Sequence, residues 1–141
     1  MKFVIYGEPK AKKRHKTFRR GNYVGQYNPS VEDENNIRSQ LIPHKPNTPL
    51  VGSLKLRLNI YKKIPKSFSK KKRIMAEKGE IRPDGRPDLD NYIKLFKDAA
   101  NSILWKDDSQ IVEYLPGTGK YYSETPRWEV ELVSIEEQKR R

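Results

Sequence analysis

Apolar and polar residues alternate most regularly between residues 53 and 60. Leucine or isoleucine occupies every even position from Leu54 to Ile60, and polar or basic residues occupy the odd positions. A period of two residues sends alternate side chains to opposite faces of a β-strand. We therefore expect a half-buried strand here, with a basic outer face. Shorter stretches predict further strands at residues 2–6, 23–27, 110–115, 121–122 and 127–135.

Three other segments carry helical signals. Apolar residues recur at helical spacing from residue 89 onward, which predicts a buried helix over about residues 90–104. A helix at residues 31–41 is expected after Ser30, which has the side chain of an N-cap. A shorter helix at residues 70–78 should end at the glycine that follows it.

These elements predict a single α+β domain over residues 1–141, with a mixed β-sheet packed with about three helices. A basic N-terminal arm at about residues 8–22 is expected to be a solvated loop, and a charged tail occupies about residues 136–141. Apolar residues make up only 34% of the chain, so the core is lean and a partner subunit would help to complete it.

Positive charge is the strongest feature of the composition. The chain has 30 Lys and Arg residues against 18 acidic residues, which gives a formal net charge of +12. Charge of this size favours nucleic acid as a partner. The chain has no cysteine, which excludes disulfides and thiol catalysis, and His15 and His44 lack zinc-binding spacing.

Neither a membrane segment nor a signal peptide is expected. No apolar run approaches the roughly 20 residues that span a bilayer. The N-terminal apolar stretch, residues 3–6, is far shorter than the apolar region of a signal peptide. We therefore expect a cytoplasmic protein.

Acidic residues gather at Asp88 and Asp90 and again at residues 107–108. Pro87 favours extended backbone, in which residues two apart share one face, so Asp88 and Asp90 can meet at one ion with Asp90 as the helix N-cap. Lys94 lies one helical turn further on, and residues 107–108 lie where the chain turns back. Carboxylate oxygens suit Mg²⁺, which can activate water for phosphodiester hydrolysis.

A structural role for the same residues is the alternative. Asp90 would then only cap the helix, Asp88 would pair with Arg86, and Lys94 would be a solvated helix residue. The acids at residues 107–108 would form an ordinary turn. The spacing alone is compatible with both interpretations.

Basic residues form two dense runs, 10–20 and 62–73, with seven Lys or Arg residues in each. Such runs suit contacts with phosphates, which position DNA without reading its sequence. A solvated surface without a partner is the alternative. The residues expected to contact DNA are Lys10, Lys12, Lys13, Arg14, Lys16, Arg19, Arg20, Lys70, Lys71, Lys72, Arg73 and Arg86.

The segment Gly117-Thr118-Gly119-Lys120 looks like the end of a nucleotide-binding phosphate loop. That motif also requires glycine where Tyr114 stands, and serine or threonine where Tyr121 stands. We interpret the segment as a turn between strands and expect no nucleotide cofactor.

Residues 87–114, PDLDNYIKLFKDAANSILWKDDSQIVEY, resemble the core signature of the RusA family of Holliday junction resolvases. In that signature a DLDN-type segment and a lysine precede a helix, and a DD-Q motif follows it. The likeness extends weakly over nearly the whole chain, through residues 7–9 and 27–30. Residues 15–16 depart from it, because many relatives carry Pro-Arg where this chain has His-Lys.

The resemblance implies a RusA-like endonuclease that forms a homodimer, requires Mg²⁺ or Mn²⁺ in its place, and nicks opposite strands of four-way DNA junctions in recombination and repair. It implies that Asp88, Asp90 and Asp108 are metal ligands and catalytic residues, and that Lys94 is the catalytic lysine. Asp107 is the less expected member of its pair. The alternatives are a non-catalytic nucleic-acid-binding module and a Mg²⁺ nuclease for flap or other branched DNA.

Overall fold

The structure, a computed structural model, describes residues 1–136, so all but the first residue of the predicted C-terminal tail lies outside it. Its α-helices are α1 (Val31–Leu41), α2 (Lys70–Glu77) and α3 (Leu89–Ala100). In this part of the chain no helix is long and apolar enough to cross a membrane.

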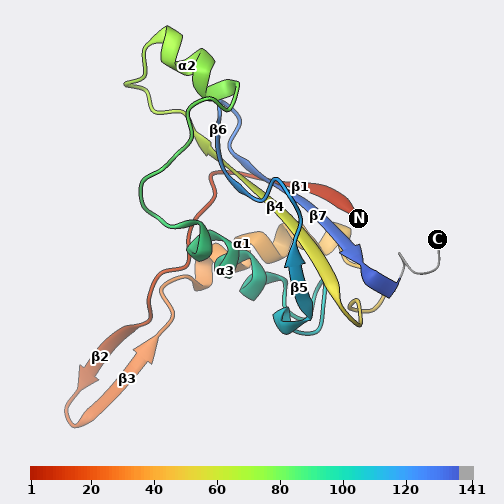
Figure 1. The fold of residues 1–141 in the computed structure, drawn as a ribbon. Helices are drawn as coiled ribbons and strands as arrows, with labels where there is room; N and C mark the ends of the chain where they lie inside the picture. The colour runs from red at the N-terminus through yellow and green to blue at the C-terminus, as the bar shows by residue number, and fades with distance from the viewer. Residues whose placement is uncertain (137–141) are drawn as a thin grey trace.

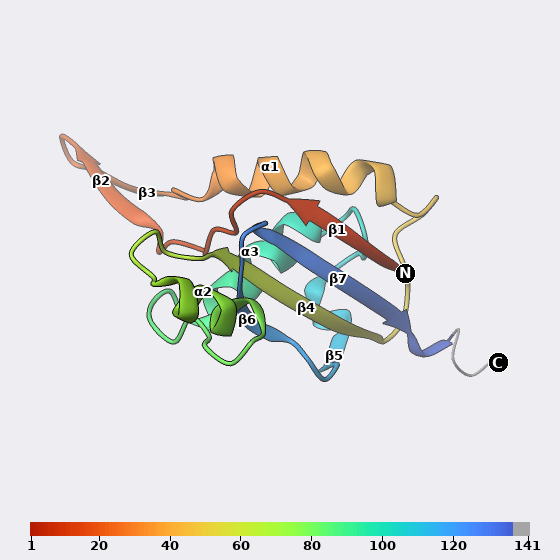
Figure 2. The ribbon, with the colours of Figure 1, turned by 90° about the horizontal axis from the view of Figure 1, so that it is seen from above.

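Strand β4 (Leu54–Lys63) is the centre of the sheet. It pairs antiparallel with β7 (Arg127–Ser134), and β1 (Lys2–Tyr6) continues the sheet beyond β7. Along its other edge, β4 pairs in parallel with β5 (Ile111–Tyr114) and, further on, with β6 (Gly119–Ser123). The sheet is mixed, as the sequence predicts, and Figures 1 and 2 show its long strands lying side by side.

One face of the sheet forms the hydrophobic core. The alternating side chains of β4 from Leu54 to Ile60 are fully buried, and Trp128, Val130 and Leu132 of β7 join them. Helices α1 and α3 supply most of the remaining core, and Phe3 and Ile5 of β1 add to it. The opposite face is polar, where Arg57 pairs with Glu131 at 3.1 Å. The predicted half-buried strand is therefore confirmed.

Helix α3 ends four residues earlier than the apolar periodicity predicts. Its last residue is Ala100, and Asn101 already has extended backbone. The chain then turns, because the backbone amides of Ile103 and Leu104 both bond to the Ala100 carbonyl. Trp105 remains fully buried and donates its indole NH to the Asn101 side chain at 2.7 Å. The apolar residues of the turn continue the helical spacing, so the sequence pattern predicted a helix longer than the one that forms.

The N-terminal arm contains a β-hairpin instead of the solvated loop that its polarity predicts. Strand β2 (Lys16–Arg20) pairs antiparallel with β3 (Tyr23–Tyr27), which the sequence does predict. Gly21 takes the left-handed backbone conformation of the tight turn between them. In Figure 1 this hairpin projects well away from the sheet. Both of its faces are largely exposed, so β2 lacks the apolar alternation that marks a half-buried strand.

Ser30 was expected to cap a helix and does not, whereas Ser69 caps α2. The Ser69 hydroxyl oxygen accepts a hydrogen bond from the Lys72 amide at the start of α2. Ser30 precedes α1 but makes no such cap, because its buried hydroxyl accepts from the Lys13 amide at 2.8 Å. The serine thereby joins the basic arm to the start of α1.

Truncating Leu58 to alanine is expected to lower the free energy of unfolding by about 2–5 kcal/mol, since the sheet cannot close fully around the cavity. Val112, whose exposed fraction is 57%, provides the control. Its truncation to alanine should change stability by no more than about 0.5 kcal/mol. Denaturant unfolding followed by tryptophan fluorescence measures both variants. Equal losses of unfolding free energy in the two variants would contradict the assignment of the core to the Leu58 face of the sheet.

Candidate active site

Asp90, Lys94 and Asp108 line one pocket of about 240 Å³. Helix α3 supplies Asp90 from its first turn and Lys94 from its middle. Asp108 begins the short 3₁₀ helix that precedes β5, so the chain does return to the helix as predicted. The pocket therefore brings together two carboxylates and an ammonium group from two segments that are separate in the sequence.

The amphipathic pattern of α3 decides which side chains reach this pocket. Tyr92 and Phe96 are buried in the core, where both rings contact Trp128. Asp90 and Lys94 are four residues apart and share the opposite, solvent-facing side. Burial of one face of the helix therefore presents the other face to solvent.

The N-cap position of α3 belongs to Asp88, not to Asp90 as predicted. Asp88 has extended backbone, with φ −66° and ψ 151°, and its side chain makes no capping hydrogen bond. Among the described residues, neither Asp88, Asp90 nor Asp108 forms an ion pair with a basic side chain. The structural alternative, in which Asp90 caps the helix and Asp88 pairs with Arg86, is therefore not what the structure shows.

Asp107 and Asp108 have different surroundings. The Asp107 carboxylate accepts the Ser109 amide at 3.0 Å, and hydrogen bonds from Ser109 hold the pKa of Asp107 below its ordinary value. Gln110 completes the turn, because its amide oxygen accepts from the Asp107 backbone while its NH₂ donates to the Leu50 carbonyl. Asp107 thus fixes the turn, and Asp108 faces the pocket.

Asp88 lies in a neighbouring pocket with Arg14, Arg86 and Asn91. Within residues 1–136 no group of three Asp, Glu, His or Cys side chains is close enough to form a metal site. Asp90 and Asp108 remain as a pair of hard oxygen donors in one pocket. Mg²⁺ is commonly held by one or two carboxylates, with waters and substrate phosphate completing its shell, so this pair fits the ion.

Comparison with known proteins identifies the family. The family model of the endodeoxyribonuclease RusA matches residues 6–133, nearly the whole chain. The chain belongs to the RusA endodeoxyribonuclease family. It is also 40% identical over 139 residues to the uncharacterized protein YqaN of Bacillus subtilis (strain 168), with 96% of each chain covered. The resemblance seen in the sequence is confirmed, and the pocket on α3 belongs to a phosphodiester-cleaving enzyme.

Two further polar residues of this pocket were not predicted as site residues. Lys97 lies seven residues after Asp90 on the same side of α3, and Tyr114 ends β5. The Lys97 ammonium donates to the Tyr114 hydroxyl at 3.0 Å. Helical spacing from Asp90 could have indicated Lys97. No sequence signal indicates Tyr114, because its position depends on the pairing of β5 with β4.

Lys12 was predicted to contact DNA, but its ammonium is held inside the protein. It pairs with Glu34 of α1 and with Asp98 of α3, the latter at 3.2 Å, and only 11% of its side chain is exposed. Burial acts to lower the pKa of Lys12, but hydrogen bonds and charge attraction from the two acids raise it overall. Asp98 also lies 3.5 Å from Lys94, so this network reaches the edge of the pocket.

The other basic residues predicted to contact DNA are exposed, with one exception. Arg73 of α2 pairs with Glu124 at 2.6 Å and donates to the Pro65 carbonyl. Figure 1 shows the β2–β3 hairpin and α2 projecting from the body in different directions. The exposed set consists of Lys10, Lys13, Arg14, Lys16, Arg19, Arg20, Lys70, Lys71, Lys72 and Arg86.

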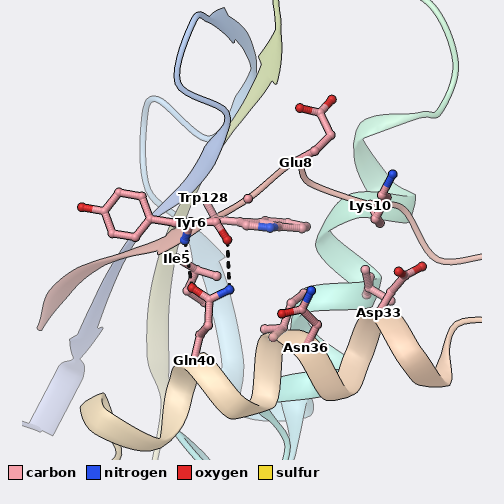
Figure 3. A pocket seen from close by; sticks show the side chains of 11 residues that line it. Ile5, Tyr6, Glu8, Lys10, Asp33, Asn36, Gln40 and Trp128 are labelled. Carbon is pink, nitrogen blue, oxygen red and sulfur yellow. Dashed lines mark hydrogen bonds between the residues drawn. The ribbon is translucent and has the colours of Figure 1, made fainter.

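A second hollow lies between β1 and α1 and holds about 60 Å³, room for about two water molecules. Figure 3 shows Gln40 facing Tyr6 there. The Gln40 side chain accepts from the Tyr6 amide at 3.0 Å and donates to the Tyr6 carbonyl at 2.9 Å. The helix therefore satisfies backbone groups of Tyr6 in β1, and we assign no ligand to this space.

The Lys12 ion pairs lead to a pH-dependent prediction. A raised pKa means that the pairs stabilise the fold fully below the ordinary value of 10.5, and that this contribution is lost as the pH rises through the raised value. Lys12→Met lacks the contribution at every pH. The difference in Tm between wild type and Lys12→Met should therefore narrow between neutral pH and about pH 11.

Thermal unfolding followed by circular dichroism measures this difference. Lys13→Met is the matched control, because Lys13 is exposed and makes no ion pair within the described residues. Its Tm should follow that of the wild type at both pH values. A Lys12→Met difference that stays constant with pH would contradict the stabilising role of the ion pairs.

Proposed function

We propose that this protein is a Mg²⁺-dependent endodeoxyribonuclease that resolves four-way DNA junctions by paired nicks, in DNA recombination and repair. The observation that carries the proposal is the pocket shared by Asp90, Lys94 and Asp108 in a chain of the RusA family. We expect a cytoplasmic homodimer with one such pocket in each subunit. Two-fold symmetry would then present equivalent sites to equivalent strands of the junction.

The three acids and Lys94 would have different roles in hydrolysis. Asp90 and Asp108 would hold Mg²⁺, or Mn²⁺ in its place, and Asp88 would join them from the extended segment before α3. When bound, such an ion would supply Lewis-acid chemistry, lowering the pKa of a nearby water and neutralising charge on the scissile phosphate. Lys94 would stabilise the negative charge that grows on the phosphate oxygens as the water oxygen bonds to phosphorus and the bond to the sugar oxygen breaks.

Positive charge on the projecting elements supports a branched substrate. The β2–β3 hairpin carries Lys16, Arg19 and Arg20, and its aromatic rings Tyr23 and Tyr27 are exposed. Helix α2 carries a second group of exposed lysines on another side of the body. Elements that point in different directions can contact DNA arms that leave a junction in different directions, through phosphates rather than bases.

Replacing Asp90 or Asp108 with asparagine should reduce Mg²⁺-dependent cleavage of a labelled four-way junction by about 10³-fold or more, since metal-ion stabilisation is worth several kcal/mol. Binding to the junction should persist, because neither residue neutralises phosphate charge. Asp107→Asn is the matched control. Asparagine can still accept the Ser109 amide, so this variant should fold and cleave.

Two outcomes would contradict the proposal. Wild-type protein that binds junctions but cleaves none with either Mg²⁺ or Mn²⁺ would indicate a non-catalytic binding module. Equal or faster cleavage of flap or duplex DNA in the same assay would assign a nuclease of different substrate preference. An Asp107→Asn variant as inactive as Asp108→Asn would contradict the separate roles given to the two acids.

Replacing Arg20 with glutamine should weaken junction binding for every sequence and reduce the slope of log affinity against log salt by about one. Arg20 is exposed on the hairpin, where its guanidinium lies 6.0 Å from the Phe18 ring centroid. Lys45→Gln removes the same charge beyond the far end of α1 and should leave the slope unchanged. Fluorescence anisotropy at several salt concentrations measures both. Equal slopes for wild type and Arg20→Gln would show that Arg20 of the hairpin does not contact the DNA.

A further inference from the structure

Lys120 holds the backbone segment that leads into Asp88. Its ammonium donates to the Gly85 carbonyl at 2.8 Å and to the Pro87 carbonyl at 3.1 Å. Lys120 is a residue of β6, which is paired along its length with β4 at the centre of the sheet. The rigid sheet therefore reaches across to the two carbonyls on either side of Arg86, immediately before α3.

Arg82 makes the reciprocal contact from the segment to the strand. Its Nε donates to the Lys120 carbonyl at 2.8 Å, and its guanidinium lies 3.9 Å from the Tyr121 ring centroid. The backbone of Gly119 makes room for it, because a Cβ at this position would lie 2.6 Å from an Arg82 nitrogen. Strand and segment are thus joined twice, once by a side chain from each.

No other hydrogen bond in the described part of the chain involves residues 81–87. The segment belongs to no helix or strand, and Asp88 at its end is exposed. A stretch without ladder or helix bonds fluctuates unless side chains hold it. Lys120 and Arg82 therefore hold the segment that precedes Asp88, and the bond from the Asn91 amide to the Asp88 carbonyl, at 3.1 Å, joins Asp88 to α3.

We propose that Lys120, aided by Arg82, is a positioning residue of the active site that fixes Asp88 for metal binding. This inference rests on the proposed function, in which Asp88 is a ligand of the same ion as Asp90 and Asp108. It also gives a role to the Gly117–Lys120 segment. The lysine donates to protein carbonyls rather than to the phosphate of a nucleotide, and the glycine before it admits Arg82.

Two variants break the contacts in different ways. Lys120→Met removes both bonds to the carbonyls and one positive charge. Gly119→Ala keeps every charge and forces only the flexible end of Arg82 to move, so the chain should still fold. Lys63→Met is the matched control, because Lys63 is exposed in the same pocket as Lys120 and its ammonium contacts neither carbonyl.

The first measurement needs no substrate. Backbone ¹⁵N relaxation of the free protein, measured by NMR, should show order parameters at residues 84–86 and 88 falling from about 0.85 toward about 0.6 in Lys120→Met, because the segment moves once its carbonyls are released. Gly119→Ala should change in the same direction by less, since the Lys120 bonds remain. Lys63→Met should match wild type. Unchanged order parameters in Lys120→Met would overturn the proposal.

The second measurement is Mn²⁺ binding to the DNA-free protein, by the loss of the free-ion paramagnetic resonance signal. Lys120→Met should bind Mn²⁺ about tenfold more weakly, as expected when a residue that orients a metal ligand is removed. Nicking by this variant should recover partly at higher Mn²⁺ concentration, which loss of a DNA contact would not produce. Wild-type Mn²⁺ affinity in Lys120→Met would overturn the role of Lys120 in metal binding.

The failure of this inference is distinguishable from failure of the proposed function. If wild-type protein cleaves junctions and Lys120→Met shows wild-type order parameters and Mn²⁺ affinity, only the positioning role is wrong. If wild-type protein binds no Mn²⁺ and cleaves no DNA, the proposed function is wrong and the metal-positioning role is wrong with it. The ¹⁵N order parameters then still report whether Lys120 holds the segment.

Discussion

The contact of Tyr92 and Phe96 with Trp128 is the interaction on which the site depends. Both rings of α3 meet the indole of β7 at centroid distances of about 6 Å, where aromatic pairs add to the energy of burial. Once these side chains face the core, the rotation of α3 is fixed. Asp90 and Lys94 must then face solvent, on the side to which the turn before β5 brings Asp108. The chemistry of the pocket is thus a consequence of hydrophobic packing on the opposite side of one helix.

Ion pairs with basic side chains neutralise several acids outside the site. Glu34 and Asp98 are occupied by Lys12, and Glu131 is occupied by Arg57 on the polar face of the sheet. Forming these pairs costs side-chain entropy. Each pair also leaves its carboxylate unable to compete for a cation. Asp88, Asp90 and Asp108 make no such pair in the described part of the chain. In a chain of net charge +12, acids left unpaired beside exposed lysines are suited to a metal ion and a polyanion together.

The two sides of the proposed site differ in how they are held. Asp90 and Lys94 belong to a packed helix, and Asp108 follows a turn that Asp107 and Gln110 fix by hydrogen bonds. Asp88 instead ends a segment that is joined to the fold by the contacts of Lys120 and Arg82. Such a segment adjusts more readily than a helix, since its opening costs less free energy than unfolding the core. Among the proposed metal ligands, Asp88 is therefore the one most sensitive to changes outside the pocket.

The sequence by itself determined the strand at residues 54–60, the mixed α+β class and the acids of the pocket, because hydrophobic period and motif spacing are local properties. It also favoured Asp108 over Asp107 through family resemblance, and the structure adds the physical reason that Asp107 bonds within the turn. Tertiary structure alone decided that α3 ends at Ala100, that Lys12 is held in ion pairs rather than free to contact DNA, and that Tyr114 reaches the pocket. Each of these outcomes depends on which segment, distant in the sequence, packs against the residue in question. Contacts between distant segments produce no periodic pattern of apolar residues, so the sequence alone does not reveal them.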